Sequence, residues 1–329
     1  MKFVRYNGGK TGLVVGDGTD LRVIDIQAGV AALRRDHADA AERIAAVLPP
    51  GDHGSWVEMI GQWDAVRDAF LLLQETSDTA ELTQPMDDCS IEAPLADPQV
   101  RMFAIGSNTA VHIIRAMKVM LGADLTEEQV TQSKRDDLPP CGFTVWPSTV
   151  VGPDATVAPP RGTRAFDYEG ECAVYVKSAG RYQDEVAIWG YTAFNDLGVR
   201  DTHLKLAKEA NWGPFSFNPQ KNFDSGKACG PWVSVDEVED ISRLRCVVTV
   251  NGEPRQNWGL DEMIYGFNET LSFLSQGLTL RPGDMLASGT GAGVAIEGGV
   301  DGPHWLKPGD VVEVTLDGIA PLRNVVGDW

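Results

Sequence analysis

Short apolar segments separated by Gly, Pro and Asp turns dominate the chain from about residue 100 onward, and this pattern restricts its fold most strongly. Such segments are typical of buried or half-buried β-strands. The clearest examples are residues 172–176, 188–194, 246–250 and 311–314. Asn251-Gly252, directly after the third segment, is typical of a hairpin turn. Only one helical segment, residues 261–275, interrupts the strands, so the pattern predicts a β-rich α+β fold.

The first 96 residues have a different pattern. Short strands are expected at 3–6, 12–15 and 21–24, followed by helical spacing of apolar residues over 26–47 and 56–74. A polar stretch over 75–90, with Pro94 and Pro98 after it, marks a boundary. We therefore expect a small α+β domain at 1–96, which carries no cluster of reactive groups, and a larger β-rich domain at 97–329.

The charge of the chain limits its partners. Its 329 residues include 28 Lys and Arg against 47 Asp and Glu, a net charge of -19. Such an acidic surface repels phosphate backbones and anionic lipid, so nucleic-acid and membrane partners are disfavoured. The five cysteines are scattered without Cys-x-x-Cys spacing, which argues against a disulfide framework or a thiolate zinc site. No segment resembles a signal peptide or a membrane span of about 20 apolar residues, so we expect a cytoplasmic protein.

Three carboxylates are expected to converge at the strand that begins near residue 170. Side chains two residues apart share a face of an extended chain, so Glu169 and Glu171 point the same way. The next apolar strand ends at Asn195-Asp196, which places a third carboxylate near them. Oxygen ligands alone suit a hard cation, Mg²⁺ or Mn²⁺, with Ca²⁺ possible. The alternative for any Glu-x-Glu is a solvated strand face.

A glycine-rich segment, residues 288–294, permits a backbone turn whose N–H groups face an anion. It lacks the Lys-Ser/Thr ending of a phosphate loop, and no βαβ pattern precedes it. We therefore do not assign it to nucleotide binding.

Several segments, taken in order, resemble the fumarylacetoacetate hydrolase family. The matching segments are Gly106-Ser107-Asn108-x-x-x-His112, Asp167-Tyr168-Glu169-Gly170-Glu171, residues 190–196 followed by Arg200-Asp201, Lys221-x-Phe223-Asp224, Gly230-Pro231-Trp232, residues 250–253, Ser288-Gly289-Thr290 and residues 306–310. Together they extend over residues 101–326. The N-terminal segment also resembles the small domain that many members carry.

This resemblance implies a catalytic domain built as a mixed β-sandwich roll. It also implies a homodimer. It implies that Glu169, Glu171 and Asp196 bind Mg²⁺ or Mn²⁺, and that the substrate is a small 2-keto or 2,4-diketo acid. Lys221 and Arg200 would stabilise developing negative charge. The Thr290 hydroxyl would bind the substrate carboxylate. This agrees with the hard-cation site expected from the three carboxylates, because a 2-keto acid chelates a hard metal through two oxygens.

The chain departs from the family pattern around His112, on a lid segment at about 112–142. Hydrolytic members place a Glu three residues after the His, whereas this chain has Arg115 there. Arg115 could lie beside His112 on a helical turn and contact substrate, but it provides no carboxylate to orient the imidazole. The lid carries an added piece, residues 123–140, with a helix start at Thr126. We expect the pocket walls to come from the lid and the N-terminal domain.

Three further groups are candidates for the missing base. Glu127 and Glu128 lie in the added lid piece, and His203 stands where the family often has Gln. Solvated loop carboxylates are the common alternative.

Three functions remain open from the sequence. The first is hydrolytic C–C cleavage of an acylpyruvate-like diketo acid, with His112 acting on water. The second is a lyase or isomerase on the same scaffold, such as a 2-keto acid decarboxylase, hydratase or tautomerase. The third is a metal- and keto-acid-binding protein without catalysis.

Overall fold

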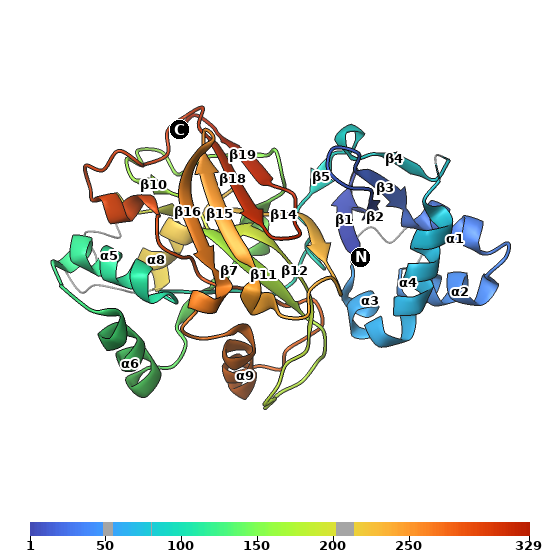
Figure 1. The fold of residues 1–329 in the computed structure, drawn as a ribbon, viewed down its shortest axis with the longest axis horizontal. Helices are drawn as coiled ribbons and strands as arrows, with labels where there is room; N and C mark the ends of the chain where they lie inside the picture. Colours follow the sequence, from blue (N-terminus) through green and yellow to red (C-terminus); the bar gives the residue numbers. More distant parts are fainter. Residues whose placement is uncertain (49–54, 80, 202–213) are drawn as a thin grey trace.

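The computed structural model describes residues 1–48, 55–79, 81–201 and 214–329, and Figure 1 shows its ribbon. The helices are α1 (Ile26–Leu33), α2 (Ala38–Val47), α3 (Val57–Gly61), α4 (Trp63–Ser77), α5 (Ala110–Leu121), α6 (Glu127–Asp137), α8 (Pro214–Lys221) and α9 (Phe267–Gly277). Short 3-10 helices lie at Met86–Asp88, Pro147–Thr149, Ile241–Arg243, Leu260–Glu262 and Ala295–Gly298. Among the residues described, no helix is both long and apolar enough to span a bilayer.

The strands form one large mixed sheet, a smaller sheet and a short ribbon. The large sheet has 12 strands, ordered β4 (Thr83–Pro85), β3 (Arg22–Asp25), β2 (Lys10–Val15), β1 (Lys2–Tyr6), β14 (Lys227–Ser234), β12 (Ile188–Asn195), β11 (Gly170–Val176), β17 (Met285–Ala287), β6 (Met102–Ile105) and β7 (Gly142–Val145), with β5 (Ile91–Glu92) on β1 and β8 (Val150–Val151) on β14. The smaller sheet has the order β16 (Glu253–Gly259), β15 (Arg245–Val250), β18 (Val311–Leu316), β19 (Leu322–Val326) and β9 (Thr156–Val157). The ribbon pairs β10 (Phe166–Asp167) with β13 (Gly198–Val199).

Strand β11 is buried on both faces, which explains the uninterrupted apolar sequence of its residues 172–176. Val174 and Val176 belong to a core shared with Val248 of β15 and Val314 of β18, because the smaller sheet packs on this face. Tyr175, which lies between Val174 and Val176 and so faces the other side of the strand, belongs to a second core that includes side chains from the helices of the N-terminal segment. Two packed sheets with helices therefore make the β-rich α+β fold that the sequence predicts.

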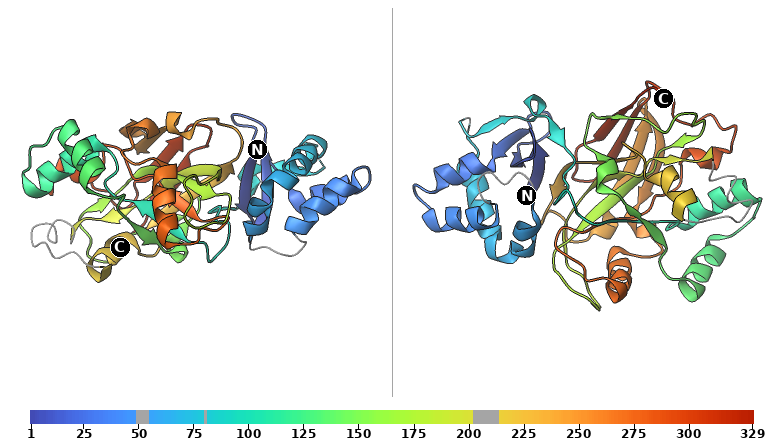
Figure 2. Two further views of the ribbon diagram at one scale, coloured as in Figure 1. Left: turned by 90° about the horizontal axis from the view of Figure 1, so that it is seen from below. Right: turned by 180° about the vertical axis from the view of Figure 1, so that it is seen from behind.

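The N-terminal strands continue the large sheet. Strand β1 pairs antiparallel with β14, with Phe3 opposite Val233. The ring centroid of Phe3 lies 5.6 Å from that of Trp63, edge-on, and 5.4 Å from that of Trp189, which ties α4 to strand β12. In all three views the N-terminal helices lie at one end of the molecule and α5 and α6 at the other (Figures 1 and 2). The domain boundary at residue 96 stays a prediction.

Three expected helices differ from the structure. The helix expected over 56–74 is divided into α3 and α4 at Gln62. The helix expected over 26–47 is divided into α1 and α2, and the break lets both pack against α4. The helix expected from residue 261 begins only at Phe267, because backbone N–H groups before it bond to Asn108. Ile264 N–H donates to the Asn108 carbonyl at 2.7 Å, and Tyr265 N–H donates to Asn108 Oδ1 at 2.9 Å. The hairpin at Asn251-Gly252 is confirmed, with both residues at positive φ.

Candidate functional site

Three buried carboxylates meet where β11 and β12 run side by side. Glu169 and Glu171 flank Gly170, which pairs with Asn195, and Asp196 follows directly. One oxygen from each carboxylate lies within 4.8 Å of the other two. The sequence-based expectation that these side chains converge is therefore matched by the geometry.

Gly170 has a packing reason to be glycine. A Cβ atom at this position would lie 2.2 Å from Val248 Cγ2 and 3.2 Å from Cys246 Sγ. Strand β15 therefore approaches the backbone of β11 directly between the two glutamates, and any side chain would push the sheets apart.

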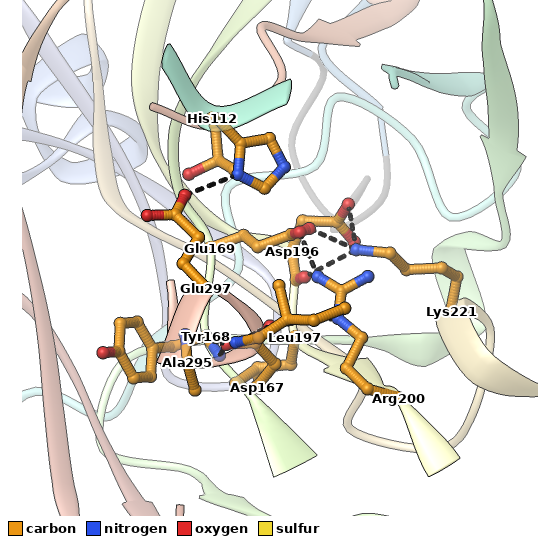
Figure 3. Close-up of polar contacts among 12 residues, drawn as sticks. His112, Asp167, Tyr168, Glu169, Asp196, Leu197, Arg200, Lys221, Ala295 and Glu297 are labelled. Carbon is orange, nitrogen blue, oxygen red and sulfur yellow. Dashed lines mark hydrogen bonds and ion pairs between the residues drawn. The ribbon is translucent and has the colours of Figure 1, made fainter. Parts of the chain in front are cut away.

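Arg200 and Lys221 lie inside this cluster and not on the surface (Figure 3). The Arg200 guanidinium donates to Asp167 at 3.0 Å and also to Glu169. Lys221 Nζ donates to Asp196 Oδ2 at 2.8 Å and also to Glu169. Both cations are thus engaged by the carboxylates they neutralise.

A second lysine, which the sequence analysis missed, also contacts the cluster. Lys227 is fully buried, and its Nζ lies 2.8 Å from Asp196 Oδ1. It donates to the carbonyls of Leu197 and Gly226 at 3.0 Å and to that of Lys221. Burial lowers the pKa of Lys227 to about 8, although Asp196 opposes this shift. Its position in the sequence could have indicated this role, because Lys227 is the first residue of strand β14 and the other residues of that strand are all apolar or small.

His112 has a carboxylate partner after all. Its Nδ1 lies 2.8 Å from Glu297 Oε1, although the two residues are far apart in sequence. Figure 3 shows the second ring nitrogen turned away from Glu297. An ionised carboxylate only accepts hydrogen bonds, so in the neutral imidazole Nδ1 carries the proton and Nε2 keeps the lone pair. The expectation that His112 lacks an orienting carboxylate is therefore wrong.

Arg115 contacts the same carboxylate from the outside. Its Nη1 lies 3.3 Å from Glu297 Oε2, and its side chain is 56% exposed. Gly293 N–H donates to the same oxygen at 2.9 Å. The glycine-rich segment does present N–H groups to anions, as expected, but here the anions are the protein's own: Gly289 N–H likewise donates to Glu171 at 3.1 Å.

The carboxylates of the cluster have opposite electrostatic environments. Burial disfavours ionisation of Glu169, but Arg200, Lys221 and His112 outweigh it and hold the pKa of Glu169 well below its usual range. Burial, together with repulsion from Asp196 and Glu169, raises the pKa of Glu171 well above its usual range. Glu171 is thus the carboxylate that the surrounding cations do not neutralise.

This imbalance fits a divalent cation. Among the described residues, four buried carboxylates (Asp167, Glu169, Glu171, Asp196) face three buried cations (Arg200, Lys221, Lys227). One negative charge is in excess, and it lies where three carboxylate oxygens converge. Hard cations such as Mg²⁺ and Mn²⁺ prefer this all-oxygen environment. The residues present therefore fit a divalent metal.

The remaining expected site residues fall in different places. Thr290 lines the pocket, but its hydroxyl donates to Gly170 O at 3.1 Å and accepts from Gln256 at 2.8 Å. Glu127 and Glu128 begin α6 as exposed residues and do not line the pocket. His203 lies outside the described residues.

One pocket of about 810 Å³ contains the cluster. Its lining includes His112, Glu169, Glu171, Asp196 and Lys221, with residues of α5, β6 and β7 as further walls. No described residue of the segment 1–96 lines it, so the expectation that the N-terminal domain forms part of the wall is wrong. The lid segment does contribute, as expected.

Comparisons with known proteins agree with this geometry. Residues 101–327 match the model of the fumarylacetoacetate (FAA) hydrolase C-terminal family. The chain is 32% identical to oxaloacetate tautomerase YisK of Bacillus subtilis (strain 168) over 248 residues, which cover 74% of each protein.

Solved structures share the whole fold. Maleylpyruvate hydrolase from Sphingobium sp. SYK-6, in complex with manganese(II) ion and pyruvate, has a TM-score of 0.67 at 21% identity, with 100% of both chains covered. The 5-carboxymethyl-2-hydroxymuconate delta-isomerase of Mycobacterium smegmatis has a TM-score of 0.63 at 21% identity, with 99% of both chains covered. These neighbours are enzymes with different reactions on one fold. The chain belongs to the fumarylacetoacetate hydrolase family.

Proposed function

We propose that this protein is a divalent-metal-dependent enzyme that hydrolyses the C3–C4 bond of an acylpyruvate, a 2,4-diketo acid. The observation that carries the proposal is the hydrogen-bonded pair of His112 and Glu297 in the same pocket as Glu169, Glu171 and Asp196. This arrangement combines a general base with a site for a Lewis acid, and C–C hydrolysis needs both.

Glu169, Glu171 and Asp196 are the residues that would hold the metal. When bound there, a divalent cation would act as a Lewis acid on a keto acid and would stabilise the enolate that cleavage releases. Lys221 and Arg200 add positive charge to the same end of the pocket, where the substrate anion would lie. A role for Thr290 in carboxylate binding stays a prediction, because its hydroxyl proton is already donated to Gly170 O.

His112 would move the protons. Its free Nε2 takes a proton from water, and the resulting hydroxide adds to the C4 carbonyl. The C3–C4 bond then breaks, its electron pair goes to the enolate of pyruvate, and a carboxylic acid leaves with the acyl group. Glu297 stabilises the imidazolium meanwhile, and His112 returns the proton to C3 to give pyruvate.

Keto–enol tautomerisation is the second candidate. The relative at 32% identity is named an oxaloacetate tautomerase, and the same histidine pair could move a proton at C3 without any bond cleavage. Decarboxylation and hydration belong to the same alternative, and loss of catalysis with retained binding is the third.

One experiment separates these functions. The purified protein with Mn²⁺ or Mg²⁺ is incubated with acylpyruvates and with oxaloacetate, in ¹⁸O-labelled water and separately in D₂O. Hydrolysis places ¹⁸O in the released carboxylic acid. Tautomerisation exchanges C3 hydrogen for deuterium without fragments, and decarboxylation releases CO₂. Intact, unlabelled substrate throughout would overturn both catalytic proposals and leave the binding protein.

The choice between Mg²⁺ and Mn²⁺ and the homodimer are further parts of this proposal. Metal analysis of the protein purified without chelators would identify the cation, and sedimentation would give the oligomeric state.

A further inference from the structure

The pocket has a second half without charge. Its volume of about 810 Å³ lies near the upper end of the range, about 300–1,000 Å³, that encloses drug-sized ligands, so a four-carbon keto diacid would leave much of it unfilled. The apolar residues of its lining include Ile113, Ala116, Met117 and Met120 of α5, with Ile105, Phe143 and Ile296. The Phe143 ring lies next to the cluster, 5.7 Å from Lys221 Nζ. The lining also has uncharged polar side chains, from Ser107, Cys141, Thr144 and Asn218.

Helix α5 provides most of this apolar wall. Ile113, Met117 and Met120 recur three or four residues apart and so share one face of the helix. At 1.5 Å per residue, Met120 lies about 12 Å further along the axis than His112. These side chains are only half-buried although apolar. Methionine is also the side chain that adapts most readily to an apolar ligand.

Among the described residues, the lining of the pocket includes no arginine or lysine besides Arg200 and Lys221. Lys134 Nζ lies 3.5 Å from Cys141 Sγ of the lining, but Lys134 is not itself a lining residue. The arginine and lysine of the lining, Arg200 and Lys221, both pair with carboxylates of the charged cluster. The basic residues of α5 are engaged elsewhere: Arg115 pairs with Glu297, and Lys118 pairs with Asp124 at 2.7 Å. A second substrate carboxylate at this end would therefore lose its hydration without gaining a basic partner among the described lining residues.

The charge count of the cluster favours the same kind of substrate. The four buried carboxylates and three buried cations leave one excess negative charge, which a divalent metal would convert to one excess positive charge. A single substrate carboxylate neutralises that charge. A dicarboxylate would leave one buried negative charge uncompensated, which is costly.

We propose that the pocket selects a monoanionic keto acid whose far end is an apolar acyl chain, alkyl or aryl, and discriminates against dicarboxylates. The inference rests on the proposed function for the keto-acid end, and it adds the chemistry of the other end. Ile113, Met117 and Met120 of α5 are its specificity-determining residues.

Binding tests the inference without catalysis. The probes are straight-chain 2-oxo acids from pyruvate to 2-oxooctanoate, and 2-oxoadipate as the diacid matched to 2-oxohexanoate, titrated into the Mn²⁺-loaded protein by calorimetry. Each buried methylene should strengthen binding about fourfold. 2-Oxoadipate should bind at least about tenfold more weakly than 2-oxohexanoate. Affinity that is independent of chain length, or a preference for the diacid, would overturn the inference.

A charge added to the wall provides the second test. Met117→Lys should weaken binding of 2-oxooctanoate at least about tenfold and strengthen binding of 2-oxoadipate. The matched control is Leu121→Lys, which adds the same charge to α5 at a position that is 53% exposed and outside the lining. Equal effects of the two variants would overturn the role of Met117.

Turnover of acylpyruvates of increasing chain length, measured in parallel, separates the two proposals. Binding that strengthens with chain length but without turnover would support the apolar tail and overturn the hydrolase. Turnover with equal binding of all chain lengths would support the hydrolase and overturn the apolar tail. Neither binding nor turnover would overturn both.

Discussion

Replacing Glu297 by Gln tests the histidine pair most directly. The substitution keeps the size of the side chain and removes its charge. The amide can also donate an N–H to His112 Nδ1, which would move the ring proton to Nε2, the nitrogen that has to accept a proton from water. We therefore expect a loss in kcat rather than in substrate binding, because the charge of Glu297 acts mainly once the imidazolium has formed.

The size of this loss follows from the geometry. The Nδ1–Oε1 distance is 2.8 Å, and the side chains of His112 and Glu297 are 12% and 6% exposed. A hydrogen bond to a charged group contributes about 1.5–3 kcal/mol. At 1.36 kcal/mol per tenfold in rate, kcat should fall about 10- to 150-fold.

The assay is the initial rate on an acylpyruvate with saturating Mn²⁺, with circular dichroism as the check on folding. Arg115→Ala is the matched control, because it removes the other side-chain partner of Glu297 from an exposed position. Exposed ion pairs contribute about 0–1 kcal/mol, so its kcat should fall less than about fivefold. A folded Glu297→Gln protein with unchanged kcat, or equal losses in both variants, would refute the reasoning.

Three further predictions concern the metal and the packing around it. Mn²⁺ at a hundredfold excess over its Kd should stabilise the folded protein by about 2.7 kcal/mol. With an unfolding entropy of about 2.1 cal/mol/K per residue, this stabilisation raises Tm by about 4 °C. In Glu171→Gln the rise in Tm should disappear, and a rise equal to that of the parent would argue against Glu171 as a ligand. Gly170→Ala should lower the free energy of unfolding in urea by about 1–3 kcal/mol, since its Cβ would lie 2.2 Å from Val248; an unchanged midpoint would contradict the tight packing. The side chain of Asn108 accepts a hydrogen bond from Tyr265 N–H and donates to the carbonyls of Tyr265 and Ser288. Asn108→Ala should therefore lower the free energy of unfolding in urea by about 1–3 kcal/mol for each buried backbone group left unpaired. Stability equal to that of the parent would show that these groups find other partners.

Local rules explain why much of the site could be predicted. The two-residue period of a strand is sufficient to place Glu169 and Glu171 on one side, and an antiparallel neighbour that ends at Asn195 brings Asp196 to them. Thr126 caps α6 through a reciprocal hydrogen-bond pair with Gln129, which is also a local pattern. Such features depend on residues close in sequence or on adjacent strands, so the amino-acid sequence alone determines them.

Other features depend on tertiary structure. Glu297 reaches His112 across 185 positions of the chain, and no spacing or periodicity links the two residues. Lys227 becomes a partner of Asp196 only because β14 lies beside β12 in the large sheet. The apolar part of the pocket arises because residues of α5, β6 and β7 line the same cavity, while the N-terminal helices lie at the opposite end of the molecule from α5 (Figure 1). The sequence by itself determined the strands, the turns and the three converging carboxylates. Which distant side chains complete the site was decided by the packing of sheets and helices, because only packing brings such segments within contact distance.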